Sequence, residues 1–148
     1  MNRKQPFTFE EFKDIYSKVP RLCVDLVIQT EDGILLTLRE KNGYVGQWHL
    51  PGGTVFYRES SESAIQRVAM EELNVEVSVI KLLGYIEYFS EVEKRGFGYA
   101  VSLAFLCKLE SSDIKLDDQA SKSQFFKAIP ENTVVEQKAF FEKLQIPS

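Results

Sequence analysis

The sequence is poor in cysteine and histidine and has no excess of basic residues. Its 148 residues include two cysteines, one histidine and 18 lysines plus arginines against 22 aspartates plus glutamates. Cys23 and Cys107 lie within apolar runs, which favours buried thiols in a reducing compartment over a disulfide framework. The net charge of −4 provides no positive field for an anionic polymer or surface. Nucleic acid and membrane are therefore not expected as partners.

Long apolar runs are also missing. No segment approaches the roughly 18–20 apolar residues that a membrane-spanning helix needs. The N-terminus, MNRKQPFTFEEF, is basic and then acidic, without the apolar centre of a signal peptide. We therefore expect a cytoplasmic protein. There is no repeat or low-complexity linker, and 44% hydrophobic residues are enough for one core, so we expect a single domain over residues 1–148.

The order of patterned segments predicts an α/β protein of the α+β kind. Residues 8–18 are an expected helix, because Thr8 and Glu11 match a capping box, and residues 1–20 would form a helical extension. Strands at 22–29 and 34–39 are expected to form a hairpin. Further strands are expected at 75–79, 81–89, 97–109 and 124–127, and a closing helix at 133–144. This mixture favours an α/β/α sandwich with a mixed central sheet over a doubly wound parallel sheet.

The clearest predicted helix spans residues 60–73 and follows a loop-like stretch, GYVGQWHLPGG, at 43–53. Ile65, Ala69 and Leu73 share one apolar stripe at helical spacing. The loop contains Pro51 and adjacent glycines, which punctuate the chain before the helix. The pattern therefore places a glycine-rich loop directly before an amphipathic helix.

Carboxylates gather at this loop and helix. Glu71 and Glu72 are adjacent on the helix, and Glu59 precedes it and can approach the same region. Arg67 stands one turn before Glu71, so an i,i+4 ion pair can hold that carboxylate. Carboxylates and backbone carbonyls, such as that of Gly52, are hard oxygen donors suited to Mg²⁺. The alternative is that Glu62, Arg67, Glu71 and Glu72 form the solvated face of an amphipathic helix.

The spacing of these residues resembles the Nudix box, G-x5-E-x7-R-E-U-x-E-E-x-G-U with U aliphatic. Glu59 follows Gly53 after five residues, Arg67 follows after seven more, and Glu71 and Glu72 form the acidic pair. The resemblance implies a Nudix-type α/β/α sandwich and a hydrolase that uses Mg²⁺, or Mn²⁺, on a small nucleotide substrate. It makes Arg67, Glu71 and Glu72 the expected catalytic residues, and Gly52, Glu59, Glu71 and Glu72 the expected metal ligands.

Two positions depart from the box. Val68 replaces the glutamate that should follow Arg67, so the site loses a carboxylate that the family commonly uses for metal binding or water activation. Asn74 replaces the late glycine, and asparagine tolerates the left-handed conformation that ends many helices. We therefore expect the helix to end normally and the metal site to be reduced.

A similar loss occurs in one Nudix branch, the GDP-mannose mannosyl hydrolases, which the N-terminal helix and the segment CVDLVIQ also resemble. This resemblance implies substrate-binding roles for Asp25, Arg39 and Tyr88, with Tyr88 at a histidine position of the branch. Thr54 stands where the branch has an arginine. That branch attacks the sugar carbon and uses a histidine base, whereas His49 lies in the loop before the glycines and is more typical of a structural residue.

Three functions remain open at this point. The first is hydrolysis of a nucleotide sugar such as GDP-mannose, at the glycosyl carbon or the pyrophosphate. The second is an ordinary Nudix pyrophosphohydrolase, which Val68 disfavours, and the third is a non-catalytic nucleotide-binding module, which the retained carboxylates disfavour. Candidate bases are Glu91, Glu93, Asp117 and Asp118. We also expect a homodimer.

Overall fold

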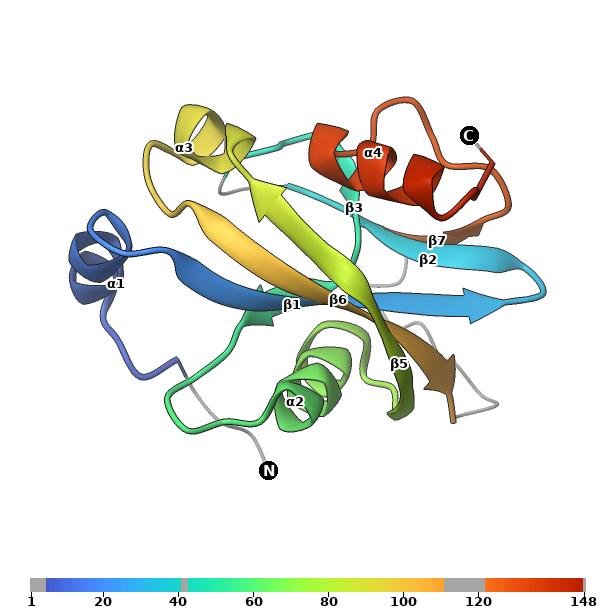
Figure 1. The fold of residues 1–148 in the computed structure, drawn as a ribbon, viewed down its shortest axis with the longest axis horizontal. Coiled ribbons are helices and arrows are strands. Elements are labelled where there is room, and N and C mark those ends of the chain that lie inside the picture. The colour runs from blue at the N-terminus through green and yellow to red at the C-terminus, as the bar shows by residue number, and fades with distance from the viewer. Residues whose placement is uncertain (1–4, 41–42, 111–121, 148) are drawn as a thin grey trace.

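The structure is a computed structural model that describes residues 5–40, 43–110 and 122–147. Figure 1 shows its elements arranged around one central sheet, with the N-terminal helix at one end. In chain order they are α1 (Phe9–Tyr16), β1 (Arg21–Thr30), β2 (Gly33–Leu38), β3 (Trp48–His49), β4 (Gly52–Thr54), α2 (Ser61–Leu73), β5 (Val77–Tyr88), α3 (Ser90–Arg95), β6 (Ala100–Leu109), β7 (Ser123–Phe126) and α4 (Val135–Lys143).

The sheet is mixed and carries helices on both faces. Its strand order is β3-β2-β1-β6-β5, with β4 beside β1 and β7 beside β2, and β1 runs parallel to β6. Alternate side chains of β1 serve opposite faces. Val24, Leu26 and Ile28 join the core under α2, whereas Cys23 and Val27 join the cores under α4 (Figure 1). The predicted α/β/α sandwich is confirmed.

Along one edge, β1 pairs with two different strands, β4 and β2. Gly52 and Gly53 belong to β4. β1 pairs with β4 near its start and with β2 at its end, both antiparallel. A Cβ on Gly52 would collide with Asp25 Oδ1, and a Cβ on Gly53 would lie 3.2 Å from Val68 Cγ2. Gly52 therefore needs glycine, whereas a side chain at Gly53 would require Val68 to shift by a few tenths of an ångström. Because β4 has no side chains at Gly52 and Gly53, Asp25 on one face of the sheet and Val68 on the other both approach its backbone.

Several predicted elements are confirmed and others need correction. Thr8 caps α1 through the expected capping box, and the β1–β2 hairpin and α2 are present. The two strands predicted at 75–79 and 81–89 are one strand, β5, because irregular pairing after Val79 and Leu82 shifts the side-chain alternation. The predicted loop at 43–53 contains the short strands β3 and β4.

Helix α3 was not predicted, and the strand expected from residue 97 begins at Ala100. Six residues are too few to show a helical period. Gly96, with φ 94°, ends α3.

The cysteines agree with the expectation of buried thiols. Cys23 and Cys107 are buried free thiols, and burial raises the pKa of each to about 12. Within the described ranges, every helix is too short or too polar to cross a bilayer.

Asn74 ends α2 in the left-handed conformation, with φ 52° and ψ 41°. We expect Asn74→Ala to lower the free energy of unfolding by about 1 kcal/mol, because a Cβ is strained there and alanine lacks the local hydrogen bonding of asparagine. Asn74→Gly should stay close to wild type. Urea unfolding of the three proteins measures this, and equal stability of the alanine variant would contradict it.

Candidate active site

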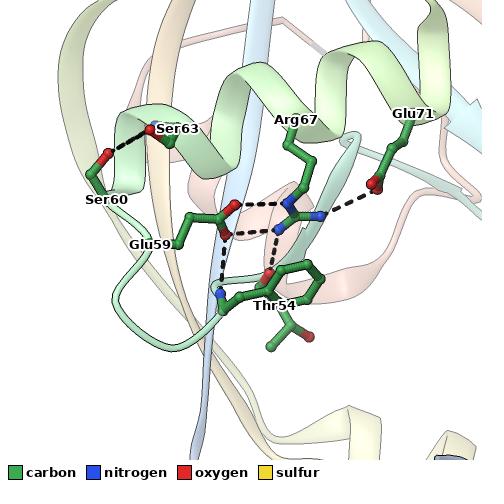
Figure 2. A network of polar contacts seen from close by, with 7 residues as sticks. Thr54, Glu59, Ser60, Ser63, Arg67 and Glu71 are labelled. Atoms are coloured by element: carbon green, nitrogen blue, oxygen red, sulfur yellow. Dashed lines mark hydrogen bonds and ion pairs between the residues drawn. The ribbon is translucent and has the colours of Figure 1, made fainter. Parts of the chain in front are cut away.

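Arg67 is the centre of a buried polar network beneath α2 (Figure 2). Its Nε and Nη2 donate to the two oxygens of Glu59, at 2.8 and 3.0 Å. Nη2 also donates to the carbonyl of Thr54 at 2.8 Å, and Nη1 donates to Glu71 at 3.2 Å. The side chains of Arg67 and Glu59 are 7% and 3% exposed. The alternative of a solvated helix face is therefore wrong for Arg67.

The local sequence explains why Arg67 meets Glu59. Ser60 caps α2 by accepting from the Ser63 N–H at 3.1 Å, so the helix begins immediately after Glu59. Helical side chains lean toward the N-terminus, which directs Arg67 back to the loop. Burial alone lowers the pKa of Arg67, but Glu59 and Glu71 raise it, and the net shift is upward.

Glu59 joins the loop to the helix. Its Oε1 also accepts from the backbone N–H of Phe56 at 3.0 Å, and the ring of Phe56 lies 3.9 Å from the guanidinium of Arg67. Both carboxylate oxygens therefore have protein donors in this arrangement. The role of Glu59 as a metal ligand stays a prediction, whereas its hold on Arg67 follows directly from the geometry.

The backbone of β4 turns the polar groups of Gly52 away from β1. Leu26 N–H donates to the carbonyl of Pro51, and Val55 N–H donates to the carbonyl of Leu22, both at 2.9 Å. Polar groups alternate along a strand, so those of Gly52, which follows Pro51 and stands opposite Asp25, face away from β1. The carbonyl of Gly52 is thus available to a ligand on the side of α2.

The Glu72 carboxylate accepts a hydrogen bond from the Gly52 N–H. Burial raises the pKa of Glu72 to about 7, and the charges of Asp25 and Glu71 add to the rise. The charge of Arg39 and a hydrogen bond from the Gly52 N–H act in the opposite direction. An additional cation would relieve this crowding of negative charge.

The donors at this place fit a hard divalent cation. The Glu72 carboxylate and the Gly52 carbonyl are oxygen donors, and Glu71, with a side chain 40% exposed, lies beside them. In the described part of the chain, no group of three or more histidine, cysteine, aspartate or glutamate side chains is close enough to hold a metal. Mg²⁺ commonly takes one or two protein carboxylates and completes its shell with water and substrate phosphates.

The three expected substrate-binding residues line one pocket on the other side of Gly52. Asp25, Arg39 and Tyr88 all contribute to its wall. Tyr88 is buried and its hydroxyl donates to Asp25 Oδ2 at 2.6 Å. Burial raises the pKa of Asp25 to about 6, while the hydrogen bond from Tyr88 acts to lower it.

The pocket also contains two arginines, Arg21 and Arg95, that the sequence did not single out. Arg21 donates to Thr54 Oγ1 at 2.8 Å and pairs with Glu91, which also pairs with Arg95 at 3.3 Å. A guanidinium therefore stands beside Thr54, although the branch's arginine is missing there. Together with Arg39, two more arginines make the pocket suitable for phosphates. They come from separate elements, so no local motif joins them.

His49 and the proposed bases occupy different environments. His49 Nδ1 donates to the carbonyl of Leu50 at 2.7 Å, its Nε2 lies 3.1 Å from Thr37 Oγ1, and burial lowers its pKa to about 4. A neutral ring with both nitrogens engaged agrees with the structural role expected for it. Glu91 is buried between two arginines and Glu93 is exposed on α3. Asp117 and Asp118 lie outside the described residues.

The structure thus combines an α/β/α sandwich with carboxylates at a loop–helix junction, and comparison with known proteins gives the family. The NUDIX domain family model matches residues 19–143, and the chain therefore belongs to the Nudix family. It is a Nudix hydrolase acting on a nucleoside diphosphate derivative, and such enzymes generally use a divalent metal ion. The non-catalytic alternative is thereby set aside.

Two relatives are similar in sequence. The low-salt glycan biosynthesis protein Agl8 of Haloferax volcanii is 39% identical over 79% of this chain and 77% of its own length. An ADP-ribose pyrophosphatase of Methanocaldococcus jannaschii is 32% identical over 72% of this chain and 62% of its own length.

Solved structures share the fold at low identity. The MutT protein of Methanosarcina mazei Go1 superposes with a TM-score of 0.70 at 20% identity, covering 86% of this chain and 95% of its own. A UDP-X diphosphatase gives 0.64 at 18% identity, covering 94% and 72%. These likenesses show the fold alone.

The raised pKa of Glu72 predicts how stability depends on pH without metal. The folded state favours the protonated carboxyl, so its contribution is complete below about pH 4.5 and is lost as pH rises through about 7. Glu72→Gln stays neutral, so we expect its stability relative to wild type to increase across that range by on the order of 2 kcal/mol. Urea unfolding in chelator measures the difference. Parallel pH curves would contradict the expectation.

Proposed function

We propose that this Nudix hydrolase cleaves a nucleotide sugar, such as GDP-mannose, in a Mg²⁺-dependent reaction at the glycosyl carbon. The observation that carries the proposal is Val68, which is 2% exposed and packs against Gly53. An apolar side chain thus fills the place of a carboxylate one turn before Glu72. A reduced metal site suits departure of a diphosphate from carbon better than attack on phosphorus, where metals position both the entering and the leaving oxygen.

The residues of the pocket divide the work of such a reaction. Glu72 and the Gly52 carbonyl would hold Mg²⁺, which when bound supplies positive charge to the diphosphate. Arg39 is fixed at the end of β2 by backbone hydrogen bonds of 2.9 Å to Gln47 and Gly46, and it binds the phosphates. Water adds to the sugar carbon and gives up its proton to a carboxylate of the pocket. The electrons of the broken C–O bond stay on the nucleoside diphosphate.

The name of one relative supports a sugar substrate. The Haloferax volcanii protein is described by a role in glycan biosynthesis, and glycans are assembled from activated sugars. The identity of 39% extends over most of both chains. A nucleotide sugar therefore fits both the relative and the reduced metal site.

A pyrophosphohydrolase is the second candidate. The relative from Methanocaldococcus jannaschii is named as an ADP-ribose pyrophosphatase. Glu71 remains partly exposed beside Glu72 and is held by Arg67, so it offers an additional carboxylate for a second ion. This candidate requires attack at phosphorus.

Loss of the Glu72 charge should abolish most of the activity. We expect Glu72→Gln to reduce turnover of the best nucleotide sugar by tens- to hundreds-fold, because the site loses a metal ligand. A substrate screen with Mg²⁺ or Mn²⁺, followed by phosphorus NMR of the products, provides the assay. Glu62→Gln, on the exposed first turn of α2, is the matched control. Turnover of the Glu72 variant within about threefold of wild type would refute the assignment.

Arg39 should contribute to binding more than to the chemical step. We expect Arg39→Ala to raise KM and to weaken binding of a nucleoside diphosphate by about tenfold or more, because a charge-assisted hydrogen bond to phosphate is lost. Arg39→Lys should fall between the two, since lysine keeps the charge without the planar fork. Calorimetry measures the affinities, with exposed Lys108→Ala as control. Unchanged affinity in the alanine variant would rule out this role.

A further inference from the structure

A chain of buried hydrogen bonds connects α4 to the wall of the pocket. The Leu50 N–H donates to Gln137 Oε1 at 2.7 Å, and Gln137 Nε2 donates to the Tyr88 hydroxyl at 2.8 Å. That hydroxyl donates to Asp25 Oδ2 at 2.6 Å. Gln137 is 3% exposed, and the other three residues of the chain, Leu50, Tyr88 and Asp25, are also buried. Buried polar groups need their partners, so the chain constrains its members strongly.

The chemistry of the donors fixes the direction of every bond in this chain. A backbone N–H can only donate, so the atom of Gln137 that faces Leu50 must be the amide oxygen. The amide nitrogen then faces Tyr88 and can only donate to it. The single proton of the Tyr88 hydroxyl must therefore point to Asp25, which accepts it at Oδ2.

The other oxygen of Asp25 lies against Gly52. A Cβ on Gly52 would collide with Asp25 Oδ1, and both residues line the same pocket. The Gly52 N–H also donates to Glu72. A rotation of the Asp25 carboxylate would consequently disturb the backbone that separates the pocket from the carboxylates of α2.

We propose that Gln137 is a positioning residue of this active site. It directs the Tyr88 proton to Asp25 and so fixes the rotation of the Asp25 carboxylate, with Oδ1 at Gly52 and the substrate. The neutral amide combines an acceptor for Leu50 with a donor for Tyr88 at any pH, whereas an ionised carboxylate in its place has no donor. The proposal rests on the proposed function, which assigns this pocket to the substrate.

Gln137→Glu tests the direction of the bonds while keeping the shape of the side chain. In its ionised form the new carboxylate still accepts from Leu50 but gives Tyr88 no donor, so the Tyr88 proton turns to it and Asp25 loses that proton. A protonated glutamate would keep both bonds, so kcat is measured across pH. We expect kcat to fall about tenfold or more, with a smaller change in KM. Gln66→Glu makes the same chemical change at an exposed position of α2 and should leave both constants unchanged.

A double-mutant cycle separates positioning from a general structural effect. If Gln137 acts through Tyr88, Gln137→Glu should change kcat less than about twofold in a Tyr88→Phe background. An equal loss of kcat in both backgrounds, or kcat of the single variant within about twofold of wild type across the whole pH range in which both proteins stay folded, overturns the proposal. Circular dichroism checks folding, and Gln137→Met enters the same cycle if the glutamate variant does not fold.

NMR of protein labelled at the tyrosine ζ-carbon tests the proposal without a substrate. The Tyr88 resonance is identified by its loss in Tyr88→Phe. It should shift in Gln137→Glu and Gln137→Met and stay in place in Gln66→Glu. An unchanged resonance overturns the role of Gln137 even if the enzyme hydrolyses nucleotide sugars. If the enzyme hydrolyses no nucleotide sugar but the Tyr88 resonance shifts, the proposed function is wrong. The proposed direction of the Gln137 and Tyr88 hydrogen bonds then still stands.

Discussion

The site depends on one buried ion pair, between Arg67 of α2 and Glu59 of the preceding loop. The two hydrogen bonds of this pair, and the bond from Arg67 to the carbonyl of Thr54, join the helix, the loop and β4 (Figure 2). Removing one partner of such a pair costs about 3–5 kcal/mol, because the other charge stays buried without compensation. The arrangement therefore holds Glu71 and Glu72 at a fixed place beside Gly52.

The pairing of β1 with two strands, β4 and then β2, brings helix α2 close to the pocket. Glu72 comes from the face covered by α2, whereas Asp25 and Tyr88 belong to the face covered by α4. A continuous sheet would separate them, but the glycines of β4 leave only backbone between them. Opposite charges then serve different parts of one substrate: carboxylates on one side suit a cation, and Arg39 on the other suits phosphate.

The sequence predicted the parts of this account that depend on local spacing. The capping box at Thr8, the left-handed end of α2 at Asn74 and the i,i+4 contact of Arg67 all follow from neighbouring residues. Gln137 and the Arg21–Glu91 pair could not be predicted, because their partners lie 49 to 87 residues away along the chain. Such contacts depend on how strands and helices meet, and no periodic pattern records them.

Hydrolysis in ¹⁸O-labelled water tests the central claim most directly, because the label identifies the atom that water attacks. With Val68 buried in place of a carboxylate, we predict that the label enters the released sugar and that the nucleoside diphosphate stays unlabelled. Mass spectrometry of both products gives the answer in a single turnover experiment. Label found entirely in a phosphate product would contradict attack at the glycosyl carbon and would establish the pyrophosphohydrolase in its place.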